Sequence, residues 1–150
     1  VFVKNQKLKE LLQKNWNHLV KTRLYEAVVH GKITSIYNYT CLLKEDKNHI
    51  VHVSKSKGKK SITTILAVSY YNDKSFIKVL INTGRKNQIR AVLAHLDHPI
   101  MGDKKYGIKD KANRLYLHSS QLSFIHPITN KIYTFSSNCP FLKEGKPYEL

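Results

Sequence analysis

The chain has 150 residues and a formal net charge of +16, from 26 Lys and Arg against 10 Asp and Glu. This length fits one domain, and 41% hydrophobic residues can form a core, which argues against a disordered basic tail. No apolar run approaches the roughly 18–20 residues of a membrane-spanning helix, and Cys41 and Cys139 are too few for a disulfide framework. We therefore expect a cytoplasmic protein without a membrane partner.

The first half of the chain predicts one helix followed by strands. Residues 1–3 are apolar and resemble the inside of a strand, and leucines at helical spacing before Trp16 predict an amphipathic helix over residues 7–16. Alternating and β-branched stretches predict five strands, the last two of which form a hairpin: 22–29, 37–43, 50–53, 61–71 and 75–81.

The second half predicts a further helix and a second hairpin. Ile89 begins an apolar stripe at helical spacing, which predicts a helix over residues 87–97, with Asn87 as its N-cap. Two short strands, 121–125 and 131–136, follow. Together these elements predict a single α+β domain over residues 1–150, a mainly antiparallel mixed β-sheet with a few flanking helices.

The excess of positive charge indicates a polyanionic partner, and we expect this partner to be RNA. The densest lysine run lies in residues 54–60, in a loop of small residues. This loop is either a flexible arm that contacts phosphates or a solvated surface loop, and taken alone it fits the second reading better.

The sequence offers little for a metal or a cofactor. His95 and His98, like His49 and His52, have helix-compatible spacing, but each pair lacks a third ligand to complete a site. No glycine-rich phosphate loop follows a strand. We therefore expect no metal and no cofactor.

Residues 82–90 place several positively charged side chains at the junction between a strand and a helix. Gly84 allows a turn, and Arg85 and Arg90 lie close to the N-terminus of the predicted helix. Backbone N–H groups and guanidinium groups can bind a phosphate or a carboxylate there. A junction with merely solvated arginines explains the pattern equally well.

Four ordered stretches resemble the carboxyl-terminal part of the RluA-type pseudouridine synthases. Lys21 and the alternating residues from Tyr25 to Gly31 resemble K-x-Y-x-A-x-V-x-G. The other stretches match T-G-R-x-H-Q-[IL]-R at 83–90, H-P-[IV]-x-G-D-x-x-Y-G at 98–107, and R-L-x-L-H-A with L-x-F-x-H-P at 114–127. The resemblance implies the pseudouridine synthase fold and isomerisation of uridine to pseudouridine in ribosomal or transfer RNA. Such enzymes flip the uridine out of its helix, and the family needs no cofactor or metal.

The resemblance also implies site residues. Arg90 matches the family's arginine that pairs with the catalytic aspartate, and Tyr25 matches the tyrosine that packs on the flipped base and is a candidate for proton removal. Without the resemblance, Tyr25 would be interpreted as a core aromatic on a strand. Other residues of the matched segments are expected to bind substrate: Arg85, Asn87, Gln88, Leu117 and Lys104.

The chain departs from the family pattern in two ways. The family's R-L-D segment precedes the stretch that residues 1–5 match, so we expect this chain to be a piece that starts just after the catalytic aspartate and is inactive alone. Asn87 and Val92 stand where histidines are usual. The alternative to an enzyme is a non-catalytic RNA-binding module with a basic cleft, and the upstream aspartate distinguishes the two.

Overall fold

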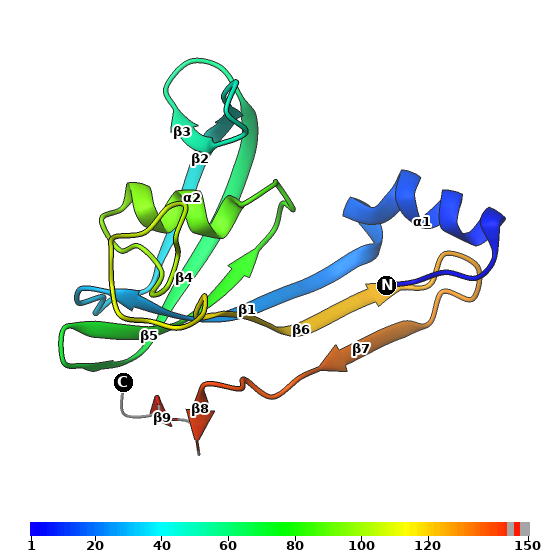
Figure 1. Cartoon of the computed structure of the whole chain (residues 1–150). Coiled ribbons are helices and arrows are strands. Elements are labelled where there is room, and N and C mark those ends of the chain that lie inside the picture. Colours follow the sequence, from blue (N-terminus) through cyan, green and yellow to red (C-terminus); the bar gives the residue numbers. More distant parts are fainter. Residues whose placement is uncertain (144–145, 148–150) are drawn as a thin grey trace.

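A seven-stranded sheet organises the computed structural model, which describes residues 1–143 and 146–147 (Figure 1). The strand order is β3-β2-β4-β5-β1-β6-β7, and every pairing within this sheet is antiparallel. Its strands are β1 (Val20–His30), β2 (Tyr37–Glu45), β3 (Val51–Ser54), β4 (Lys59–Tyr71), β5 (Lys74–Ile81), β6 (Leu117–Ile125) and β7 (Ile132–Ser136). A separate pair consists of β8 (Leu142–Lys143) and β9 (Lys146–Pro147).

Two helices accompany the sheet, α1 (Gln6–Leu19) and α2 (Gln88–His95). The side chain of Asn5 caps α1 by accepting a 3.0 Å hydrogen bond from the Leu8 backbone N–H. On the sheet side, Trp16 of α1 packs against Phe124 of β6, with ring centroids 5.6 Å apart. Neither helix in the described part of the chain is long and apolar enough to cross a membrane.

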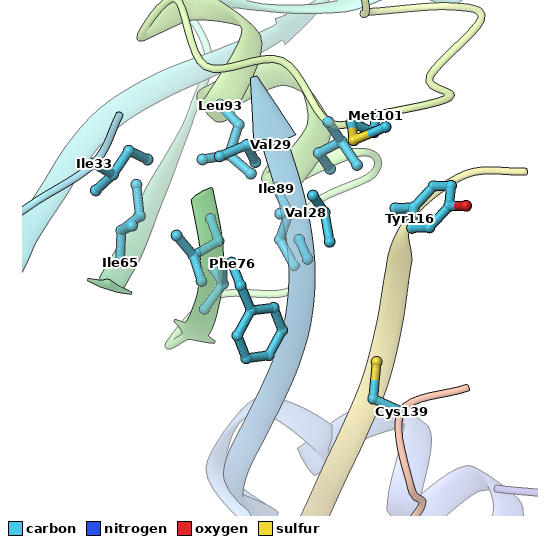
Figure 2. Close-up of a cluster of buried hydrophobic side chains, with 14 of the residues drawn as sticks. Val28, Val29, Ile33, Ile65, Phe76, Ile89, Leu93, Met101, Tyr116 and Cys139 are labelled. Atoms are coloured by element: carbon cyan, nitrogen blue, oxygen red, sulfur yellow. The ribbon is translucent and has the colours of Figure 1, made fainter. Parts of the chain in front are cut away.

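The main core lies between α2 and the middle strands of the sheet. Figure 2 shows Val29 of β1 beside Leu93 and Ile89 of α2, whereas Val28 points to the other side of β1, the face that it shares with its cross-strand partner Phe76 of β5. These five side chains are at most 5% exposed. Burial of this stripe fixes α2 on the sheet and thereby fixes the residues at its N-terminus.

The predicted α+β class and antiparallel sheet are confirmed, and both helices and strands β1 to β7 overlap the predicted ranges, although β6 begins at Leu117 rather than at residue 121. Residues 1–3 are not a strand, because they pair with no neighbouring strand in the described part of the chain.

Asn87 occupies the N-cap position of α2 as predicted, but its side chain does not cap the helix. Its backbone has φ +50° in the left-handed region, and its side chain makes no capping hydrogen bond. Asparagine tolerates this backbone conformation better than most residues. The amide is thereby left for contacts with other side chains, those of Arg90 and Tyr106.

Candidate active site around Arg90

A two-point ion pair joins α2 to the loop that follows it. Arg90 donates from Nε to Asp103 Oδ2 at 2.7 Å and from Nη2 to Asp103 Oδ1 at 2.6 Å. The Asp103 side chain is fully buried, whereas the Arg90 side chain is 23% exposed. This fork geometry fixes the plane of the guanidinium as well as its position.

The loop around Asp103 supplies two further hydrogen bonds to its carboxylate. The backbone N–H groups of Lys105 and Tyr106 each donate to Asp103 Oδ1 at 2.9 Å. Burial by itself would raise the pKa of Asp103, but the hydrogen bonds from Arg90 and from these two N–H groups outweigh it and hold the pKa below its usual value. The same ion pair raises the pKa of Arg90.

Tyr106 and Asn87 hold the guanidinium from other sides. The Arg90 guanidinium carbon lies 4.9 Å from the centre of the Tyr106 ring, a cation–π contact. The Tyr106 hydroxyl accepts from the Val51 N–H at 2.8 Å and from Asn87 Nδ2 at 3.3 Å, and Asn87 Oδ1 accepts from Arg90 Nη1 at 3.4 Å. Asn87 therefore touches Arg90 directly, which the sequence did not indicate.

Arg90 keeps free hydrogen-bonding capacity. A guanidinium carries five N–H groups, and three of those of Arg90 have partners in the described part of the chain. Two N–H groups thus remain on a partly exposed, rigidly oriented cation. This arrangement can receive a second carboxylate or a developing negative charge without rearrangement.

Glycines make the Asp103 loop possible. Gly102 has φ +71°, and a Cβ there would lie 1.7 Å from the backbone oxygen of Arg114. A Cβ on Gly107 would lie 2.5 Å from the backbone oxygen of Asp103. The two glycines of the H-P-[IV]-x-G-D-x-x-Y-G match are thus required by the close backbone approach that aims Asp103 at Arg90.

Gln88 is a structural residue, which corrects the expectation that it binds substrate. It is 2% exposed. Its Oε1 accepts from Thr83 Oγ1 and the Arg85 N–H, and its Nε2 donates to the backbone oxygen of Ile62 and to Thr63 Oγ1. The amide therefore has no free donor or acceptor for a ligand, and it ties the Thr83–Gln88 turn to β4.

Tyr25 lies on β1, half-buried against the main core. Its neighbour on the same strand face is Arg23, which is 8% exposed and donates to Asn17 Oδ1 at 3.3 Å and to the Asn82 backbone oxygen at 3.5 Å. Burial lowers the pKa of Arg23, and nearby Tyr25 acts in the opposite direction. Arg23 thus links α1 to the turn before α2, beside Gly84.

The remaining predicted residues occupy different places. Leu117 begins β6 opposite Ala27, and Ser119 lies opposite Tyr25, so Leu117 and Tyr25 are diagonal neighbours on one face of the sheet. Lys104 is exposed and lines a hollow of the Asp103 loop. Arg85 packs near β4, where its Nε donates to the Lys60 backbone oxygen at 3.0 Å.

The structure therefore brings the predicted residues together in groups. Arg90 and Asn87 share one hydrogen-bonded cluster, Arg85 and Gln88 share the turn before it, and Tyr25 and Leu117 share a face of the sheet. Asp103, Tyr106 and Arg23 were missed. The available signals were the position of Asp103 between two glycines and the two-residue spacing of Arg23 from Tyr25 on a strand.

A metal site is absent from the described residues. In residues 1–143 and 146–147, no group of three or more His, Cys, Asp or Glu side chains is arranged to hold an ion. His98, one of the spaced histidines, instead contacts the backbone oxygen of His30 through Nδ1 at 2.9 Å.

Comparisons with known proteins agree with the motifs. A sequence model described as RNA pseudouridylate synthase matches residues 1–95. The chain is 33% identical over 127 residues to the uncharacterized RNA pseudouridine synthase YjbO of Bacillus subtilis, covering 83% of this chain and 44% of that protein. It is 30% identical over 136 residues to ribosomal large subunit pseudouridine synthase D of Buchnera aphidicola subsp. Schizaphis graminum, covering 79% and 43%.

A solved structure shares the fold. The human RNA pseudouridylate synthase domain containing 1 superimposes with a TM-score of 0.79 at 23% identity, covering 93% of this chain and 63% of that one. The chain spans less than half the length of the two curated relatives.

Proposed function

Since this chain belongs to the RNA pseudouridylate synthase family, of the RluA type, we propose that the protein isomerises uridine to pseudouridine in structured RNA. The reaction breaks the bond between the ribose carbon and uracil N1 and forms a bond from the same ribose carbon to uracil C5. The proton on C5 is lost and N1 gains one, so the uridine is rearranged without a co-substrate.

This proposal rests on the fixed orientation of the Arg90 guanidinium and on its two unused N–H groups. Asp103 and Tyr106 orient its guanidinium, yet two N–H groups remain for another acceptor. A carboxylate that attacks a ribose carbon must stay ionised and correctly aimed, and a fixed cation at its side supplies both conditions. We propose that Arg90 holds the catalytic aspartate in this way.

That aspartate is the one of the family's R-L-D motif. We propose that it precedes Val1 in the encoded protein, because the curated relatives are more than twice as long as the matched region. Among the described acidic residues, Asp103 is an unsuitable nucleophile, since its side chain is fully buried and both of its oxygens accept hydrogen bonds.

Tyr25 is proposed to contact the flipped uracil. It is half-buried on the sheet face that it shares with Leu117, which gives the base an aromatic ring and an aliphatic side chain to pack on. In the described part of the chain, its hydroxyl makes no hydrogen bond, so the phenolic oxygen, after giving its own proton to solvent, is available to take the proton from uracil C5. Lys104 and Arg85 are proposed to contact the RNA.

Ribosomal RNA is the proposed substrate, with transfer RNA as the alternative, in the cytoplasm. The name of the Buchnera relative refers to the large ribosomal subunit, and the net charge of +16 suits a large folded RNA.

The test measures tritium release from RNA whose uridines carry tritium at C5. The encoded protein should release tritium from ribosomal RNA transcripts, and replacing the aspartate of an upstream R-L-D motif by asparagine should stop the release. Salt-dependent RNA binding without any release would instead identify a non-catalytic RNA-binding module.

A further inference from the structure

A second basic site adjoins the Arg90 cluster on the side of the hairpin that β2 and β3 form (Figure 1). It is a cavity of about 340 Å³ between this hairpin, the start of β4 and the turn before α2. Its lining residues are Leu43, Lys44, Glu45, Val51, Gly58, Lys59, Gly84, Arg85 and Lys86. Arg90, Asp103 and Tyr25 do not belong to this lining, whereas Arg85, which is proposed to contact the RNA, does.

Positive charge dominates the lining. Three lysines and Arg85 face one acidic residue, Glu45, among the described lining residues. Glu45 accepts hydrogen bonds from Lys86 and His49, and these lower its pKa. The carboxylate therefore neutralises part of the charge and fastens the hairpin to the turn before α2, and a net positive charge remains for an anion.

The cavity is built on fixed backbone. Gly58 approaches β2 so closely that a Cβ there would lie 2.6 Å from the backbone oxygen of Leu43. Arg85 is anchored through Nε to the Lys60 backbone oxygen, which leaves its two Nη atoms for a ligand. The buried Gln88 amide ties the Arg85 N–H to β4. Two segments far apart in sequence, 58–60 and 84–86, are thus held together.

We propose that this cavity binds a backbone phosphate of the RNA substrate, at a nucleotide other than the flipped uridine. The inference rests on the proposed function for its choice of RNA as the anion. Lysine and arginine side chains are suited to phosphate oxygens. No aromatic side chain lines the cavity among the described residues, so it has no platform on which a base could stack.

The site gives the lysine run of residues 54–60 a specific role. Gly58 and Lys59 belong to the cavity wall rather than to a freely solvated loop. Phosphate binding here holds the RNA without reading its sequence, while Arg90 and Tyr25 act on the uridine.

The first test compares two triple variants of the encoded protein with equal charge change. One carries Lys44→Gln, Lys59→Gln and Lys86→Gln, and the control carries the same change at three exposed lysines outside the cavity: Lys14, Lys111 and Lys131. RNA affinity is measured over a salt series. The cavity variant should bind at least tenfold more weakly at low salt, with the slope of log affinity against log salt reduced by about 2. The control should change less than threefold.

The second test needs no variant. In the wild-type protein, RNA should protect Lys59 and Lys86 from acylation more strongly than it protects Lys111 and Lys131, as measured by mass spectrometry. Inorganic phosphate at the same phosphate concentration should protect them much less, since it lacks the other contacts of the polymer.

The outcomes separate this inference from the proposed function. Equal losses of affinity in the two variants, or equal protection of all four lysines, would overturn the phosphate site while tritium release still supported the isomerase. Selective loss and selective protection without tritium release would uphold the phosphate site and overturn the isomerase.

Discussion

Arg90 and Asp103 are joined by two short hydrogen bonds, 2.7 Å and 2.6 Å, between a partly exposed guanidinium and a fully buried carboxylate. The pair connects the N-terminal half of α2 to the loop after Pro99. It leaves the outer N–H groups of Arg90 free. One edge of the guanidinium thus holds the loop in place, and the other edge is open to a second acceptor.

Asp103→Asn should destabilise the protein by about 3 kcal/mol, because the substitution leaves a half-buried arginine without its counter-charge. Urea unfolding with an unchanged m-value would measure this loss. Asp73→Asn is the matched control, since Asp73 is exposed and asparagine also accepts its left-handed backbone. A loss no larger than that of the control would contradict a stabilising role for the pair.

The ion pair also predicts acid sensitivity. The pKa of Asp103 is lower in the folded protein than in the unfolded chain, so the stabilisation is fully present above the unfolded pKa of about 4. It declines as the pH falls below that value toward the folded pKa. The difference in unfolding free energy between wild type and Asp103→Asn should therefore be constant from pH 7 to 5 and shrink below about pH 4. A difference independent of pH would refute this assignment.

Tyr106→Phe separates the ring of Tyr106 from its hydroxyl. The ring keeps its cation–π contact with Arg90, but the Val51 N–H loses its 2.8 Å acceptor, which costs about 1–3 kcal/mol if water cannot replace it. Thermal unfolding should show the loss, whereas tritium release at a permissive temperature should fall less than about fivefold. Tyr71→Phe, at an exposed tyrosine, should change neither quantity.

Tyr25→Phe tests proton transfer. Phenylalanine keeps the packing surface for the uracil and removes the phenolic oxygen, so the rate of tritium release should fall by about 10²–10⁴-fold with RNA affinity changed less than threefold. Single-turnover kinetics together with equilibrium RNA binding would measure both. Full activity in Tyr25→Phe would restrict Tyr25 to packing.

The regular elements could be predicted because their spacing follows directly from helix and strand geometry. The apolar stripe beginning at Ile89 gave α2, and the four ordered motifs identified Arg90. The partner of Arg90 could not be predicted in the same way, since Asp103 reaches it through an irregular loop that depends on Gly102 and Gly107.

Two polar residues next to Arg90 illustrate the limit of motif reasoning. Gln88 and Asn87 are neighbours in one motif, yet Gln88 is buried with its amide fully used, and Asn87 has a left-handed backbone and an amide bonded to Arg90 and Tyr106. The burial of one and the φ angle of the other are set by how α2 packs on the sheet. A one-dimensional pattern does not contain that information.

The most direct test of the central claim is Arg90→Ala in the encoded protein, with the single-turnover rate of pseudouridine formation and the equilibrium RNA affinity measured on the same transcript. If Arg90 holds the reacting carboxylate, the rate should fall by at least about a hundredfold while the affinity changes less than threefold. Equal losses in rate and affinity would show that Arg90 is a phosphate contact, and the account of this site would be wrong.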